Sequence, residues 1–95
     1  MIIVAGYLTV AEADRATYLD NCAAVMTDAR AAHGCLEFSL SANLLDSSRI
    51  VVHERWESRE AVESFRGSGP SGDQASATLA ASVTEYAVTG SRILI

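Results

Sequence analysis

The chain has 95 residues, of which 49% are hydrophobic and 20% charged, and its formal net charge is −5. This length predicts one domain spanning residues 1–95, and seven basic against twelve acidic residues exclude the clustered positive charge that a nucleic-acid partner needs. No stretch approaches the roughly 20 apolar residues of a membrane span, and the first residues lack the basic start of a signal peptide, so we expect a cytoplasmic protein with no membrane partner.

The first two predicted elements are a strand and a long helix. Residues 3–10 are apolar and rich in β-branched side chains, which indicates a central strand. Thr9 and Glu12 have the spacing of a capping box, so a helix is expected over residues 12–32, ending before Gly34. Its apolar residues recur at steps of three and four, as in an amphipathic helix; they are Tyr18, Cys22, Val25, Met26 and Ala29.

A β-hairpin is predicted next. Residues 35–42 alternate between apolar and polar side chains, which is the pattern of a half-buried strand. A polar turn at residues 43–48 separates them from residues 49–57, whose β-branched and aromatic side chains indicate a third strand. Because the turn is short, we expect these two strands to pair in antiparallel fashion.

The last third of the chain predicts a second helix and a final strand. Ser58 is a good N-cap for a helix, which the glycine-rich residues 67–72 end. Residues 73–81 are helix-prone, and residues 83–95 are expected to form the last strand, with a bend at Gly90. The element order β-α-β-β-α-β predicts an α+β, ferredoxin-like fold with an antiparallel four-stranded sheet.

The cysteines and the apolar sheet surface predict the state of the thiols and the assembly of the protein. Cys22 and Cys35 lack the spacing of a zinc or redox motif, so they are expected to be reduced, structural thiols, with a reactive thiol as the alternative. The alternating second strand and the long apolar last strand leave sheet surface for a second chain, which predicts a homodimer.

Two segments resemble a known family. Residues 34–38 read GCLEF and follow the first helix, and residues 54–61 read ERWESREA and link the third strand to the second helix. Both are similar to motifs of the antibiotic biosynthesis monooxygenase family. The resemblance implies a dimeric α+β barrel with a small apolar cavity between sheet and helices in each subunit. It also implies oxidation of phenols or hydroquinones to quinones with O₂ and no metal or flavin, although some relatives degrade haem.

The chain departs from the family pattern at three positions. Many quinol-oxidising relatives carry histidines on the second helix and five residues later, where this chain has Phe65 and Pro70. Some polyketide-oxidising relatives carry an Asn four residues before the tryptophan, where this chain has Val52. Of the family's catalytic set, Trp56 alone is carried over.

The third strand supplies the candidate catalytic residues. Strand alternation places Trp56 and Glu54 on one face and His53 on the other. Trp56 either seals the core or donates its indole N–H to a substrate oxygen. Glu54 is either a base with a pKa raised by burial or the partner of an arginine, Arg66 or Arg92. His53 has the pKa of a proton acceptor, but its parity favours a dimer interface.

The remaining site residues follow from the resemblance and from the aromatic content. Phe38, Phe65 and Tyr86 are expected to line a substrate pocket, with Arg66 as an anion partner. No histidine occurs among residues 58–95 and no cluster has metal-ligand spacing, so we expect neither haem, metal nor another cofactor. The sequence therefore predicts a cofactor-independent monooxygenase for a small aromatic or polyketide phenol. The alternatives are a ligand-binding barrel dimer without activity and a cofactor-free isomerase or cyclase.

Overall fold

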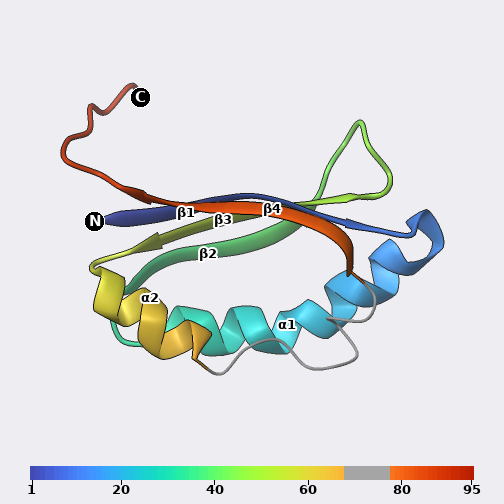
Figure 1. Ribbon diagram of the computed structural model, residues 1–95, viewed down its shortest axis with the longest axis horizontal. Helices are drawn as coiled ribbons and strands as arrows, with labels where there is room; N and C mark the ends of the chain where they lie inside the picture. The colour runs from blue at the N-terminus through green and yellow to red at the C-terminus, as the bar shows by residue number, and fades with distance from the viewer. Residues whose placement is uncertain (68–77) are drawn as a thin grey trace.

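The computed structural model describes residues 1–67 and 78–95 and shows a sheet with helices on one side (Figure 1). The elements in chain order are β1 (Ile2–Val10), a 3₁₀ turn (Glu12–Asp14), α1 (Arg15–Ala31), β2 (Cys35–Ala42), β3 (Arg49–Trp56), α2 (Arg59–Arg66) and β4 (Thr78–Ala87). The strand order is β2-β3-β1-β4, and every neighbouring pair is antiparallel. This confirms the predicted α+β, ferredoxin-like fold with its four-stranded sheet.

Strand β3 has the alternation that the sequence predicts. Its residues 50, 52, 54 and 56 are buried, and the residues between them are half-buried. The helices of the described residues lie on one side of the sheet (Figure 1), so the buried set faces α1 and α2 and the other set lies on the opposite side. We call these two sides the covered face and the open face. The register with β1 pairs Trp56 with Ile2 and Glu54 with Val4, so these residues share the covered face.

The core lies between the covered face and the helices in two adjoining clusters. One is centred on Trp56 with residues from α2, β1 and β2, and the other joins Val10 and Ile50 to Tyr18 and Cys22 of α1. The predicted apolar stripe of α1 is confirmed, because Tyr18, Cys22 and Ala29 are buried and two further members pack against the core, Val25 and Met26.

Gly6 allows β1 and β4 to approach closely. Its φ is +154°, and a Cβ there would lie 1.8 Å from the backbone oxygen of Ser82. A side chain at this position would have to push the strands apart. The sheet therefore needs glycine in the middle of its central strand.

Three sequence expectations are wrong at element ends. Thr9 is paired within β1, and neither the 3₁₀ turn nor α1 has a side-chain cap, so no capping box forms. The last strand is Thr78–Ala87 rather than residues 83–95, because β1 pairs with it along its whole length. The helix-prone residues 73–81 therefore include strand at 78–81, while residues 68–77 lie outside the described part of the chain. No helix within the described ranges is long and apolar enough to cross a membrane.

Candidate functional site

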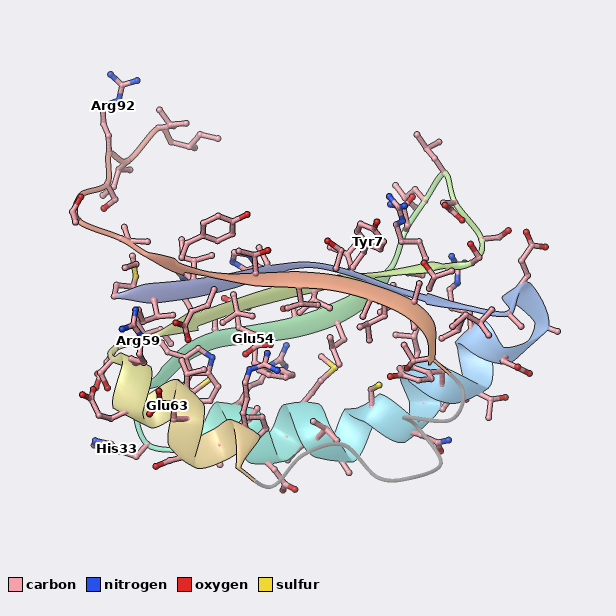
Figure 2. The ribbon with its side chains drawn as sticks, viewed as in Figure 1. Tyr7, His33, Glu54, Arg59, Glu63 and Arg92 are labelled. Atoms are coloured by element: carbon pink, nitrogen blue, oxygen red, sulfur yellow. The ribbon has the colours of Figure 1, made fainter. Side chains whose placement is uncertain are left out.

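A buried carboxylate occupies the middle of the covered face. Glu54 is 1% exposed and points from the sheet toward the helices, whereas Tyr7 lies on the opposite side of the sheet (Figure 2). The indole Nε1–H of Trp56 donates to Oε1 of Glu54 at 2.9 Å. The Nη2 of Arg66 donates to the other oxygen, Oε2, at 2.6 Å. Each carboxylate oxygen thus has a donor from the protein.

Local structure brings Arg66 to this carboxylate. The side chain of Ser58 accepts a hydrogen bond from the backbone N–H of Ala61 at 3.2 Å, which confirms it as the N-cap of α2. A helix that begins directly after β3 folds back over the covered face. Eight residues later, its last turn places Arg66 over Glu54, which is the pairing that one sequence alternative expected.

Three aromatic rings pack beside the carboxylate. The ring of Phe65 lies edge-on to Phe38, with 5.6 Å between centroids, and tilted against Trp56 at 5.4 Å. Phe38 of β2 is 4% exposed and Trp56 is fully buried. The rings give Glu54 an apolar surrounding and hold the indole against it.

Burial raises the pKa of Glu54 above the ordinary value for a glutamate, and its hydrogen bonds oppose this rise. The donor Trp56 and the cation Arg66 both favour the charged carboxylate, and His53 contributes weakly in the same direction. Burial outweighs them because removing a carboxylate from water penalises the ionised form strongly. The site therefore contains a carboxylate that is inclined to accept a proton.

The structure leaves two predicted site residues away from this group. His53 pairs with Ala5 of β1 and Ser39 of β2 and lies on the open face, as its parity indicated. Tyr86 is opposite Ile3 in the register, which places it on the open face too, and it is 52% exposed. The expectation that Tyr86 lines the pocket with Trp56 is not supported by this register.

The indole N–H of Trp56 also has a different partner from the expected one. The functional hypothesis expected this N–H to donate to a substrate oxygen, but in the structure it donates to Glu54. Its complete burial agrees with the alternative of a core-sealing residue. Trp56 thus holds the carboxylate in position from inside the core.

An open depression of about 170 Å³ lies beside the site, between β2 and the end of α1. It shares Phe38 with the aromatic group and adds residues that the sequence analysis did not single out for a site; its lining is Arg30, Cys35, Leu36, Glu37 and Phe38. The Nε of Arg30 donates to the backbone oxygen of Phe38 at 3.0 Å. Burial and the nearby Glu54 raise the pKa of the Cys35 thiol, which favours the neutral, unreactive form.

The arrangement is suited to moving a proton in an apolar setting. A buried carboxylate with raised pKa can take a proton, and an adjacent guanidinium can stabilise the anion that results. Within residues 1–67 and 78–95, no group of three or more His, Cys, Asp or Glu side chains could hold a metal ion.

Comparison with known proteins identifies related folds. The family model described as antibiotic biosynthesis monooxygenase matches residues 1–80. A Deinococcus radiodurans protein assigned to the same family has 16% identity and a TM-score of 0.82, with 100% of this chain and 99% of that chain covered. The protein Rv0793 of Mycobacterium tuberculosis has 24% identity and a TM-score of 0.77, with 95% and 96% covered.

A third similar structure is of a haem-degrading protein. MhuD of Mycobacterium tuberculosis, solved with two haems bound in its active site, has 18% identity and a TM-score of 0.72, with 97% of this chain and 99% of that chain covered. Identities this low show a shared fold and leave the reaction open. No match was found among curated proteins.

Proposed function

The chain belongs to the antibiotic biosynthesis monooxygenase family, and on that premise we propose that it oxidises a small phenol or hydroquinone to a quinone with molecular oxygen. For a phenol, one oxygen atom enters the ring and the other leaves as water. A hydroquinone instead passes two electrons and two protons to O₂, which leaves as hydrogen peroxide. In both cases the substrate supplies the electrons. Such chemistry begins with loss of the hydroxyl proton, because the phenolate reduces O₂ far more readily than the phenol.

The observation that carries this proposal is the buried Glu54 between Trp56 and Arg66. Its carboxylate is held by hydrogen bonds of 2.9 and 2.6 Å in an apolar, ring-lined setting. Glu54 takes the hydroxyl proton, Arg66 stabilises the phenolate, and Trp56 acts as a positioning residue for Glu54. Phe38 and Phe65 provide ring surface for the aromatic substrate.

Glu54 is a better candidate base than His53. Histidine commonly acts as a proton acceptor in enzymes, but His53 lies on the open face, away from the aromatic rings. Histidine on that face is also poorly placed as an axial haem ligand for the covered face. The other histidine, His33, follows the C-terminal end of α1. These positions favour a small phenol over haem as the substrate.

Oxygen consumption by chelator-treated protein, with a panel of naphthohydroquinones and anthrones, tests the proposal. We expect uptake without added metal or flavin, and a decrease in kcat of about 10²- to 10⁴-fold in Glu54→Gln. The matched control is Arg59→Met, which removes an exposed arginine of α2 that pairs with Glu85 at 3.1 Å. Binding of these compounds without oxygen uptake would overturn the oxidase proposal in favour of a ligand-binding or isomerase function.

We also propose that two copies pack through their open faces, giving a cytoplasmic homodimer. Supporting residues on this face are the half-buried Ile3 and Val51 and the exposed Tyr86, apolar side chains that no helix of the described residues covers. The C-terminal tail rises on the same side and exposes Ile93, Leu94 and Ile95 (Figure 1). Light scattering at micromolar concentration should give a dimer, and Val51→Asp should shift it toward monomer. A wild-type mass of about 10 kDa, the monomer mass, would refute the dimer.

A further inference from the structure

The two partners in the Glu54–Arg66 ion pair differ sharply in exposure. The Glu54 side chain is 2% exposed and the Arg66 side chain 48%. The contact is end-on, through Nη2 alone, and the Arg66 side chain makes no other hydrogen bond to residues 1–67 or 78–95. The carboxylate is therefore fixed in the core, whereas the half-exposed guanidinium has further N–H donors that bond to none of the described residues.

We propose that a phenolic ligand replaces Glu54 as the partner of Arg66 in a charge-conserving exchange. The O–H bond of the ligand breaks, its proton forms a new O–H bond on Oε2 of Glu54, and the phenolate oxygen takes the place of Oε2 on the guanidinium. No electron moves, and no proton is exchanged with solvent. The exchange rests on the proposed function, because it assumes that the phenol binds beside Glu54.

Charge balance in the buried site determines which ligands it favours. Before the exchange the site holds one cation and one anion, and afterwards it holds one cation, one anion and a neutral carboxyl. A ligand that arrives already ionised, such as a benzoate, would leave two anions beside one cation unless Glu54 took a proton from solvent. An uncompensated charge in an apolar setting is strongly unfavourable. The site should thus select ligands that arrive neutral and give up a proton.

Among the described residues, the other ionisable groups on the neighbouring elements are paired or placed so that Glu54 is the acceptor. Glu85 of β4 also lies on the covered face, but β1 separates it from Glu54 and it pairs with Arg59 at 3.1 Å. Cys35 on the neighbouring strand β2 is a neutral thiol whose pKa is raised, and His53 of β3 projects to the open face. On α2, Arg66 is the cation that faces the carboxylate. The carboxylate oxygen bonded to Arg66 is thus the acceptor in the exchange, and the oxygen bonded to Trp56 keeps its donor.

Absorbance spectroscopy with 4-nitrophenol tests the exchange, because its phenolate absorbs at longer wavelength than the phenol. One pH unit below the pKa of the probe, only about one-tenth of it is ionised in solution. On wild-type protein we expect most of the bound probe to show the phenolate band, with no net proton release in weakly buffered solution. A bound probe that stays in its phenol form, or release of about one proton per bound ligand, would overturn the exchange.

Variants separate the two halves of the pair. Glu54→Gln keeps the cation without the acceptor, so the bound probe should still be phenolate but should release about one proton to solvent. Arg66→Met should bind the probe only as phenol, and Arg59→Met should behave as wild type. 4-Nitrobenzoate, matched in shape, should bind wild-type protein with uptake of about one proton and lose affinity as pH rises. Identical spectra in wild type, Glu54→Gln and Arg66→Met would contradict the proposal.

The exchange and the oxidation fail in different ways. A phenolate band without oxygen uptake from any phenol would sustain the exchange and remove the oxidase function. Oxygen uptake that depends on Glu54, with 4-nitrophenol bound only as phenol or not bound by folded protein, would overturn the exchange and leave the oxidation standing. Circular dichroism of each variant confirms that the fold is retained.

Discussion

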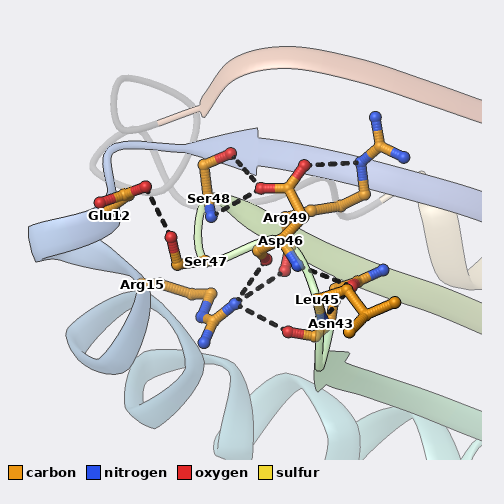
Figure 3. Close-up of polar contacts among 8 residues, drawn as sticks. All are labelled: Glu12, Arg15, Asn43, Leu45, Asp46, Ser47, Ser48 and Arg49. Atoms are coloured by element: carbon orange, nitrogen blue, oxygen red, sulfur yellow. Dashed lines mark hydrogen bonds and ion pairs between the residues drawn. The ribbon is translucent and has the colours of Figure 1, made fainter.

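Two carboxylates of this protein, Glu54 and Asp46, each lie beside an arginine and behave in opposite ways. Glu54 is buried on the covered face and touches Arg66 at 2.6 Å, and its pKa is raised. Asp46 lies in the turn between β2 and β3, 3.8 Å from Arg49, and hydrogen bonds from the side chain and backbone of Ser48 lower its pKa (Figure 3). The shorter ion pair thus belongs to the carboxylate that is harder to ionise.

The difference shows that burial, and not the distance to a cation, decides the direction of the shift. Asp46 remains in contact with water and gains donors, so its ionised form is favoured. Glu54 also has two donors, but it has lost its hydration, and a single half-exposed guanidinium does not replace that hydration. Asp46 thus helps to order a turn, whereas the raised pKa of Glu54 favours uptake of a proton.

The arginines of the two regions, Arg15 and Arg66, differ in the kind of acceptor that they bind. Arg15, at the start of α1, donates through Nη1 to the backbone oxygens of Asn43, Asp46 and Arg49 at 3.2, 2.8 and 3.4 Å (Figure 3). These neutral acceptors cannot take up a proton, so Arg15 has no exchange open to it. It holds the turn against the helix, whereas Arg66 contacts the charged carboxylate of Glu54, the partner that the proposed exchange would replace.

The largest expected effect comes from disrupting the buried region. Trp56→Ala removes a fully buried side chain that packs on Phe65 and bonds to Glu54, and should lower the free energy of unfolding by about 3–5 kcal/mol. Trp56→Phe keeps much of the packing and should cost about 1–3 kcal/mol, because Oε1 of Glu54 loses its donor. Urea denaturation measures both. Equal losses for the two variants would show that the hydrogen bond, and not the packing, dominates.

Disrupting the turn region should cost less and leave the site intact. Arg15→Met removes three hydrogen bonds to backbone oxygens while keeping the aliphatic stem, and we expect a loss of about 1–2 kcal/mol in the free energy of unfolding. Binding of 4-nitrophenol should be unchanged, because the turn lies at the other end of β3 from Trp56. A change in the phenolate band of Arg15→Met would contradict the independence of the two regions.

The sequence predicted the buried region better than the turn, for a physical reason. Strand alternation placed Trp56 and Glu54 on one face. The burial of the carboxylate predicted an ion pair with Arg66 or Arg92, and Arg66, the nearer of the two in sequence, is the partner observed. The contacts of Arg15 bridge 28 to 34 residues and end on backbone oxygens. Because every residue carries such an oxygen, no side-chain pattern indicates which of them an arginine will reach.

The position of Tyr86 was missed for a related reason. Which face a strand residue occupies depends on the register with its neighbour, and the last strand was expected to begin at residue 83. The observed β4 pairs Tyr86 with Ile3 of β1, which lies on the open face, and no local pattern reveals this pairing. Alternation along one strand gives the relative faces of its own residues, but only pairing assigns these faces to the core or to the open side.

The ionisation of Glu54 can be followed through the single tryptophan of the chain, whose indole donates to this carboxylate. A pH titration of Trp56 fluorescence should show a step above the ordinary glutamate pKa of 4.5, absent in Glu54→Gln. Arg66→Met removes a cation that favours the ionised form, so it should move the step to higher pH. A step at or below the ordinary value in wild type would contradict the raised pKa.

The raised pKa of Glu54 makes the stability of the folded protein depend on pH. Because the folded-state pKa of Glu54 lies above the unfolded one, its stabilising contribution is complete below the unfolded value and is lost as pH rises through the folded value. Wild-type protein should therefore lose stability relative to Glu54→Gln over that window. Urea midpoints of the two proteins, measured from pH 4 upward, test the sign.

Asp46 should show the smallest effect, and the opposite sign. Its folded-state pKa is below the ordinary value of 3.8, so its contribution is present above that value and is lost as pH falls through the folded one. Asp46→Asn should thus be less stable than wild type near neutral pH and should approach it below about pH 3. Urea midpoints of both proteins across this range measure the difference. If the difference in stability instead grew on acidification, the hydrogen bonds from Ser48 would favour the protonated carboxyl of Asp46. The contrast between the lowered pKa of the solvated Asp46 and the raised pKa of the buried Glu54 would then fail.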